Sequence, residues 1–225
     1  LELPWNLATF LGCALVLLAV AWAMARAGLV LPEVLLPSPA GADEPKNLRA
    51  SSLRRWAPAS LVLAVGIAVV PVLVAMRRPD AVLERWDTLY HLSALARIRG
   101  TGDGSSRTLG ILSNTVGEPV FYPAAFHDLA ALMPLGSIPA ILNGTTLALA
   151  VAPWVLGTAA LAHVLWPQIR WAGIAAALGA ALVPAAPLNE WIHLSPIPNL
   201  TGMAMIPGAL AGLLLMWRSV LDREA

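Results

Sequence analysis

Three polar side chains near the middle of the sequence have the types and the spacing needed for proton-transfer chemistry. Glu84, Asp87 and His91 follow one another at intervals of three and four residues, so on a helix their side chains would point the same way. A carboxylate and an imidazole in that arrangement can share a proton, a metal ion or the hydroxyl group of a substrate. The competing interpretation is that Asp87 and His91 only form the solvated face of an amphipathic helix.

A second histidine lies about one helical turn after a proline. Pro123 is a residue type that favours the first turn of a helix, and His127 follows it by four residues. Two histidines and a carboxylate can converge on a divalent cation, because imidazole is the commonest metal ligand in proteins. Asp87, His91 and His127 are therefore the candidate metal ligands, although their spacing lacks a tight signature such as HExxH.

The element that would position Asp87 and His91 is an amphipathic helix. Apolar residues recur at helical spacing over residues 79–99, and a helix of this kind would lie along the membrane surface. Glycine commonly ends a helix. The pattern therefore predicts an end at the glycines that follow, which are Gly100, Gly102 and Gly104.

The composition predicts an all-α, polytopic bundle of transmembrane helices. Hydrophobic residues make up 58% of the chain and charged residues 12%, about half the roughly 25% that is usual in soluble domains. A helix needs about 20 mainly apolar residues to cross the hydrocarbon core. Five stretches meet this test, some of them loosely: 7–31, 57–76, 138–165, 171–187 and 200–217.

The basic residues in the short connections predict the orientation, because cytoplasmic loops are enriched in Lys and Arg. Those that define the cytoplasmic side are Lys46, Arg49, Arg54, Arg55, Arg170, Arg218 and Arg223. Residues 77–136 then form a long extracytoplasmic loop that carries the candidate site outside the cell membrane. The shorter outer connection 188–199 adds Glu190 and His193 on the same side.

The domain organisation is that of a membrane bundle interrupted by this loop. Residues 1–31 and 57–76 would supply two transmembrane helices joined by a cytoplasmic linker, 32–56, and residues 137–225 would supply three more with a cytoplasmic tail. We expect a fragment of a longer protein. A net charge of +1 gives no concentrated basic surface for nucleic acid. The single cysteine, Cys13, cannot form an intrachain disulfide.

The outer loop resembles known membrane proteins in three segments. It resembles a family of actinobacterial polytopic membrane proteins of uncharacterised function in Trp86-Asp87-Thr-Leu-Tyr-His91, Ala96-Arg-Ile-Arg-Gly-Thr-Gly102 and Tyr122-Pro-Ala-Ala-Phe-His127. That family looks like the GT-C class of glycosyltransferases, in which a large first external loop carries two membrane-surface helices and an acidic residue. Asp87 matches that acid by position and context, and His91 and His127 match the pattern of the narrower family.

The resemblance implies an enzyme that transfers a sugar from a polyprenyl-phosphate lipid to a glycan acceptor in cell-envelope assembly. Asp87 would be the catalytic base for the acceptor hydroxyl. An arginine would meet the departing phosphate, since guanidinium and phosphate pair in a two-pronged geometry. The candidates for contacts with the substrate or its phosphate are Arg77, Arg78, Arg97, Arg99, His91, Tyr122, His127, Glu190 and His193.

An alternative function follows from the departures from that class. GT-C enzymes usually have more spans than the five expected here and often a C-terminal extracytoplasmic domain, whereas this sequence ends at Ala225. The alternative is a non-catalytic membrane scaffold or transporter subunit. Such a protein would use the polar loop to hold a lipid or a membrane protein partner.

Overall fold

The computed structural model describes residues 5–26, 48–114, 116–183 and 185–224. Within these ranges the chain is helical and contains no strand, which confirms the all-α fold. Helices long and apolar enough to cross a membrane number four in the described residues. They are Trp56–Met76, Ile138–Leu165, Ala172–His193 and Ile197–Leu221.

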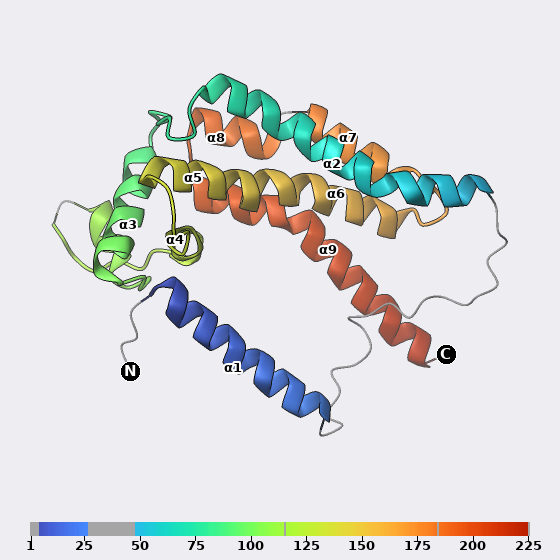
Figure 1. The fold of residues 1–225 in the computed structure, drawn as a ribbon, viewed down its shortest axis with the longest axis horizontal. Helices are drawn as coiled ribbons and strands as arrows, with labels where there is room; N and C mark the ends of the chain where they lie inside the picture. Colours follow the sequence, from blue (N-terminus) through green and yellow to red (C-terminus); the bar gives the residue numbers. More distant parts are fainter. Residues whose placement is uncertain (1–4, 27–47, 115, 184, 225) are drawn as a thin grey trace.

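The long helices pack around α6 (Ala152–Leu165). Its neighbours are α2 (Leu48–Met76), α7 (Ala172–Leu182) and α9 (Ile197–Glu224). Figure 1 shows α5 (Ile138–Thr146) continuing into α6 as one rod, and the two are joined by a π-helical turn, Leu147–Val151. Small residues allow helices to approach closely inside a membrane. The buried centre of this packing is accordingly rich in alanine: Ala64, Ala68, Val151, Val155, Ala159, Ala177 and Ala181.

The first expected span is a helix that lies to one side of the bundle in Figure 1. This helix, α1, covers Leu7–Arg26, and the apolar stretch described in it, Leu7–Val16, is shorter than the four spans. Its N-terminal end is tied to the outer loop by Trp5. The backbone N–H of Trp5 donates to the carbonyl oxygen of Gly102 at 2.8 Å, and its indole N–H donates to the carbonyl oxygen of Asp128 at 2.8 Å.

The expected cytoplasmic linker is described only in part. Residues 27–47, which include the end of the first expected span and most of the linker, lie outside the described residues. Residues 48–56 of the expected linker are helical, because α2 begins at Leu48. The helix thus extends beyond its apolar part, Trp56–Met76.

The helix that carries His91 begins later than the sequence pattern predicts. This helix, α3, covers Thr88–Thr101 instead of residues 79–99. The side-chain amide of Asn143 on α5 donates to the carbonyl oxygens of Pro79 at 2.9 Å and Ala81 at 2.8 Å. These bonds hold the segment before α3 in a non-helical path. The Asn143 side chain takes the place of the helical N–H groups that would otherwise bond to these carbonyl oxygens.

The late start changes the expected arrangement of the acidic residues. Glu84 precedes α3, whereas Asp87 is its N-cap residue and His91 lies in its first turn. The prediction of one helical face shared by Glu84, Asp87 and His91 is therefore wrong for Glu84. The C-terminal end agrees with the prediction, since Gly102 adopts the left-handed conformation with φ 73° and its N–H bonds to the carbonyl oxygen of Ile98.

Residues 77–136 form a small helical layer at one end of the bundle (Figure 1). The layer contains α3, a 3-10 turn at Leu109–Ser113 and α4 (Ala125–Ala131), which begins two residues after Pro123. Its own buried centre consists of Ala94, Ile98, Leu109 and Ala124. Other buried residues of the layer join the core of the bundle: Leu95, Phe126 and Ala130 pack with Ile141, Leu142 and Trp191.

Helices α6 and α9 cross at a pair of glycines. A Cβ added to Gly157 would lie 2.8 Å from the backbone nitrogen of Gly208, closer than Cβ atoms approach other atoms. A Cβ added to Gly208 would meet the Cα of Gly157 at an ordinary 3.6 Å. The crossing therefore tolerates a methyl group on one helix and not on the other.

We expect Gly157→Ala to lower the unfolding temperature of the purified protein by several degrees, because overpacking costs about 1–3 kcal/mol. Gly208→Ala is the matched control and should leave the unfolding temperature nearly unchanged. Thermal unfolding of both variants in one detergent measures the difference. Equal shifts for the two variants would show that the crossing is not as close as described.

Candidate functional site

Four of the expected site residues come together where α3 meets α4. Asp87 is half-buried at the start of α3, and His91 is buried one turn later. His127 is buried on α4, and Tyr122 lies just before that helix. The ring centroid of His127 lies 5.1 Å from that of His91 and 5.8 Å from that of Tyr122. The fold thus joins residues that are far apart in the sequence.

The two histidines form a hydrogen-bond chain that ends on a backbone carbonyl. Nδ1 of His91 lies 3.0 Å from Nε2 of His127, and Nε2 of His91 lies 2.9 Å from the carbonyl oxygen of Ser195. A carbonyl oxygen can only accept, so neutral His91 carries its proton on Nε2 and offers the lone pair of Nδ1. His127 therefore donates from Nε2. Its own Nδ1 is buried and has no partner among the described residues.

Burial keeps both imidazoles neutral. Removal from water, with a smaller contribution from His91, lowers the pKa of His127 to about 3. Burial also lowers the pKa of His91, against opposing effects from the Ser195 carbonyl and from the charge of Asp87. At neutral pH the pair thus has the proton arrangement that its hydrogen bonds require.

Two tyrosines close one side of the histidine pair. The ring centroids of Tyr90 and Tyr122 lie 4.6 Å apart, and the Tyr90 hydroxyl donates to the carbonyl oxygen of Leu109 at 3.3 Å. Burial, with a smaller contribution from the charge of Asp87, raises the pKa of Tyr122 to about 12. Burial also raises the pKa of Tyr90. Both hydroxyls are therefore protonated at neutral pH and can donate hydrogen bonds.

The turn between α8 (Glu190–His193) and α9 is fastened to the start of α3 through its carbonyl oxygens. Three bonds make this connection: Arg85 Nε donates to Ile192 O at 2.7 Å, Asp87 N–H to Leu194 O at 3.4 Å, and His91 Nε2–H to Ser195 O at 2.9 Å. Ser195 has φ 59° and is buried. A residue other than glycine in this left-handed region is strained and persists only where its surroundings hold it.

The carboxylate of Asp87 has no hydrogen bond or ion pair within the described part of the chain. The side chain of an N-cap aspartate usually accepts a hydrogen bond from a backbone N–H of the first turn. The backbone of such a residue is usually extended. Here the backbone is already helical, with φ −97° and ψ −6°, and the side chain makes no cap bond. The carbonyl oxygen of Asp87 accepts from His91 N–H at 3.1 Å. The backbone is thus held while the carboxylate remains available to another molecule.

The arginines expected to meet a phosphate lie in different environments. Arg78 forms an ion pair with the carboxylate two residues further on, at 2.8 Å. Arg97 lies 3.7 Å from the carboxylate of Asp103. Arg77 and Arg99 are exposed and form no ion pair in the residues that the structure describes. Of the four arginines expected to meet a phosphate, these two form no ion pair among the described residues.

The two expected residues of the second outer connection lie on α8. Glu190 is half-buried and His193 is exposed. No hydrogen bond or ion pair joins either side chain to Asp87 or to the histidine pair among the described residues. This connection contributes to the site through its backbone.

The geometry does not fit the expected divalent cation at Asp87, His91 and His127. No three His, Cys, Asp or Glu residues gather as metal ligands would in the described ranges. The facing nitrogens of the two histidines share a proton, and the other nitrogen of His91 bonds to Ser195. Of the four imidazole nitrogens only Nδ1 of His127 is unused among the described residues, and one buried nitrogen does not make a metal site.

Sequence reasoning missed Arg85, Tyr90 and Ser195. Tyr90 precedes His91 and counts as an apolar position in the helical pattern, so its place beside the histidines is hidden in that pattern. Arg85 donates to a backbone carbonyl of a distant segment, and Ser195 accepts from a distant histidine through its own backbone carbonyl. Every residue has a carbonyl group, so no residue type could have marked this contact.

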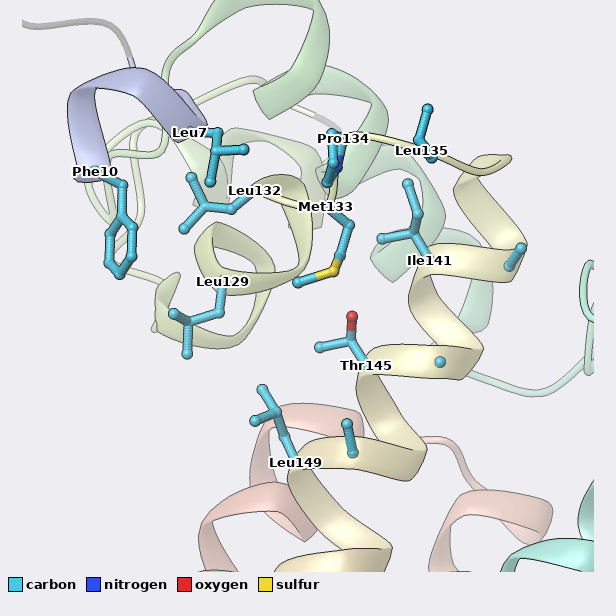
Figure 2. Close-up of a pocket in the computed structure, with 13 residues that line it drawn as sticks. Leu7, Phe10, Leu129, Leu132, Met133, Pro134, Leu135, Ile141, Thr145 and Leu149 are labelled. Carbon is cyan, nitrogen blue, oxygen red and sulfur yellow. The ribbon is translucent and has the colours of Figure 1, made fainter. Parts of the chain in front are cut away.

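An apolar groove of about 480 Å³ lies beside the outer layer, between α1, α4 and α5. Figure 2 shows Leu7 and Phe10 of α1 on the same side of the groove as Leu129 of α4 and Leu132, which follows α4. Ile141 and Thr145 of α5 lie opposite them. Thr145 is among the few residues with a polar side-chain atom that line it. A lining of this kind suits hydrocarbon chains.

A second apolar groove, of about 630 Å³, reaches Leu83 in the segment that leads to α3. It runs between α2 and α7 and is closed by Leu83, Trp191 and Ile192. Leu83 lies four residues before Asp87, and the carbonyl of Ile192 accepts from Arg85. The groove therefore connects the membrane-spanning part of the bundle with the segments that frame the carboxylate.

One further acid, Asp128, lies outside this cluster. Its Oδ1 is buried and has no partner among the described residues, and the carboxylate packs so closely on Gly104 that a Cβ there would collide with it. Burial, with a smaller contribution from Asp103, raises the pKa of Asp128 to about 6. Nothing in the sequence pattern marks this aspartate as different from a solvated one.

The raised pKa of Asp128 predicts a stability that falls with pH. Between the ordinary pKa of 3.8 and about 6 the folded protein binds more protons than the unfolded chain, so stability is lost as pH rises through this window. Asp128→Asn should unfold a few degrees higher than the wild type at pH 7, on the order of 1 kcal/mol for a partly exposed group. The two proteins should be similar at pH 4.

Thermal unfolding at both pH values measures this difference, with Asp80→Asn as an exposed control that should show no gain at pH 7. A wild-type pH profile that Asp128→Asn leaves unchanged would mean that this carboxyl group is not desolvated.

Comparison with known proteins places the chain in a family. Residues 1–225 match a family described as a family of unknown function, DUF6541, and the chain belongs to it. A search of curated proteins found no match, and a search of solved structures also found none. Membership in this family carries no activity with it, so a function has to be argued from the site.

Proposed function

We propose that this member of the DUF6541 family is an extracytoplasmic membrane glycosyltransferase that uses a polyprenyl-phosphate-linked sugar donor in cell-envelope glycan assembly. Asp87 is the general base. The observation that carries the proposal is the Asp87 carboxylate, which is half-buried and unpaired while its backbone is held on both sides. A carboxylate that solvent can reach and that has no partner among the described residues is suited to take a proton from a substrate.

The reaction needs a base on one side of the anomeric carbon and positive charge on the other. The oxygen of the acceptor hydroxyl attacks the anomeric carbon and its proton passes to the Asp87 carboxylate. The bond between that carbon and the phosphate oxygen breaks, and the polyprenyl phosphate leaves with the electron pair. Arg77, which is exposed and forms no ion pair in the described residues, is a candidate to meet the phosphate, whereas Arg99 lies in the last turn of α3, about three turns from Asp87.

The apolar groove of about 630 Å³ supports a lipid-linked donor. Its walls come from α2 and α7, which belong to the candidate membrane spans. A hydrocarbon chain in this groove would bring its head group to the level of Leu83 and Ile192, next to the segment that carries Asp87. Tyr122, with its protonated hydroxyl near Asp87, can donate to a sugar or phosphate oxygen.

The proposed site faces outward across the cell membrane. The support is the distribution of basic residues: Arg170 lies in the connection between α6 and α7, at the end of the bundle opposite the helical layer in Figure 1. A lipid-linked sugar and a glycan acceptor would meet at the outer surface.

A second candidate function is a scaffold that holds a lipid or a membrane protein partner without catalysis. The exposed apolar side chains of the outer layer favour it, since Trp86 is 89% exposed and Leu89 is 75% exposed. Apolar groups on a surface mark sites of contact with proteins or membranes. The scaffold proposal predicts that changing Trp86 weakens association with a partner and has no effect on sugar transfer.

Transfer of radiolabelled sugar from polyprenyl-phosphate donors, in membranes that express the full-length protein, tests the catalytic proposal. Asp87→Asn should lower transfer by about 100-fold or more, because a positioned base contributes about 10²–10⁴-fold to the rate. Glu84→Gln is the matched control, since Glu84 is exposed and precedes α3. It should transfer sugar at the wild-type rate.

Equal transfer by the wild type and Asp87→Asn at matched expression would remove Asp87 from the reaction. Wild-type signal no higher than that of empty membranes, across several donors, would favour the scaffold.

Labelling of single cysteines tests the orientation in intact cells. In a Cys13→Ser background, Trp86→Cys should react with a membrane-impermeant maleimide, because this position is 89% exposed in the outer layer. Arg170→Cys, which is also at an exposed position, should react only after the cells are permeabilised. The reverse pattern would place the site in the cytoplasm.

A further inference from the structure

We propose that His91 and His127 are positioning residues that hold the turn at Leu194 and Ser195 against the start of α3 and so fix the position of the Asp87 backbone, from which the carboxylate extends. The structural part of this inference stands on the hydrogen-bond geometry. Its catalytic part rests on the proposed function of Asp87.

Neither imidazole is placed to touch a substrate. His91 is 1% exposed and His127 is 0% exposed, so a sugar or phosphate cannot reach them in this structure. A buried polar ring is costly unless its nitrogens are bonded. A position that only needed filling would be served better by an apolar side chain of similar size. The hydrogen bonds of the pair are therefore its distinctive property.

The hydrogen-bond chain joins three elements that are distant in the sequence. It starts on α4 at His127, passes through His91 on α3 and ends on the turn before α9 at Ser195. The proton arrangement gives it one direction, because each ring donates from Nε2 to the next acceptor. A chain of this kind fixes relative positions more tightly than apolar contacts, which have no preferred direction.

The carbonyl oxygen of Ser195 accepts from His91 at 2.9 Å and also from the Ile197 N–H at 2.8 Å, while its other polar groups bond inside its own turn. Its hydroxyl donates to the carbonyl oxygen of Trp191 at 2.8 Å, and its N–H donates to that of Glu190 at 3.0 Å. The strained φ of 59° turns the chain at this residue. The bond from His91 then holds the turn in this conformation.

Two consecutive carbonyl groups of the turn hold two points on the first turn of α3. The carbonyl of Leu194 accepts from the Asp87 N–H at 3.4 Å, and the carbonyl of Ser195 accepts from His91 at 2.9 Å. Because two points are held, the start of the helix cannot rotate about its own axis relative to the turn. This arrangement fixes the position of the Asp87 backbone, from which the carboxylate extends without a bond of its own among the described residues.

Amide hydrogen–deuterium exchange of peptides covering residues 190–200 tests the structural part in the full-length protein. His127→Phe keeps a ring but loses the donor, so exchange in this turn should become at least about ten-fold faster. His127→Gln should stay near the wild-type rate, because its amide nitrogen can replace Nε2 as a donor. His193→Gln, at an exposed position on α8, is the control and should exchange as the wild type does.

Sugar transfer by the same variants tests the catalytic part. His127→Phe should lower kcat on the order of 100-fold, as expected for a small misplacement of a catalytic group, and leave KM within about three-fold. His127→Gln should recover most of kcat. A substrate-binding role would instead raise KM, and a role in packing alone would not be rescued by a donor of the same reach.

The outcomes separate this inference from the proposed function. Unchanged exchange in His127→Phe, or exchange in His127→Gln as fast as in His127→Phe, overturns the inference whatever the activity. If His127→Phe does not fold, His127→Asn replaces it, since its shorter amide cannot reach His91; wild-type exchange in His127→Asn then overturns the inference. Absence of transfer in the wild type removes the proposed function and leaves the exchange test to decide on the turn.

Discussion

The outer layer depends on one buried chain of hydrogen bonds, from His127 through His91 to the carbonyl of Ser195. Both rings are neutral because burial lowers their pKa values. They can therefore be enclosed without an uncompensated charge. The apolar centre of the layer is small, so directional bonds carry much of the task of fixing α3, α4 and the turn before α9 relative to one another. Asp87 takes its position from these elements.

The bundle supplies the support on which this layer rests. Leu95, Phe126 and Ala130 of the layer pack into the same core as Ile141 and Trp191, so the outer helices and the membrane spans share their packing. The groove beside Leu83 and Ile192 continues this connection on the lipid side. The groove between the spans and the segment that carries Asp87 thus belong to one arrangement, which the proposed transfer reaction would require.

The elements could be predicted where a local pattern decides them. Long apolar stretches predicted the four spans, because a helix must satisfy its own backbone in lipid, and glycine predicted the end of α3 at Gly102. The start of α3 could not be predicted, because Asn143, more than 50 residues away, binds the preceding carbonyl groups. The spacing of Asp87 and His91 marked the candidate site but not its bonds. Those end on the backbone of Ser195, and the two facing nitrogens of the candidate metal ligands His91 and His127 share a proton.

The most direct measurement is a long-range ¹H–¹⁵N NMR spectrum of the full-length protein with ¹⁵N-labelled histidine at neutral pH. Signals are assigned with His91→Gln and His127→Gln. The account predicts that both rings are neutral and protonated on Nε2, with a scalar coupling through the hydrogen bond between Nε2 of His127 and Nδ1 of His91. A proton on Nδ1 of His91, or a positive charge on either ring, would contradict it.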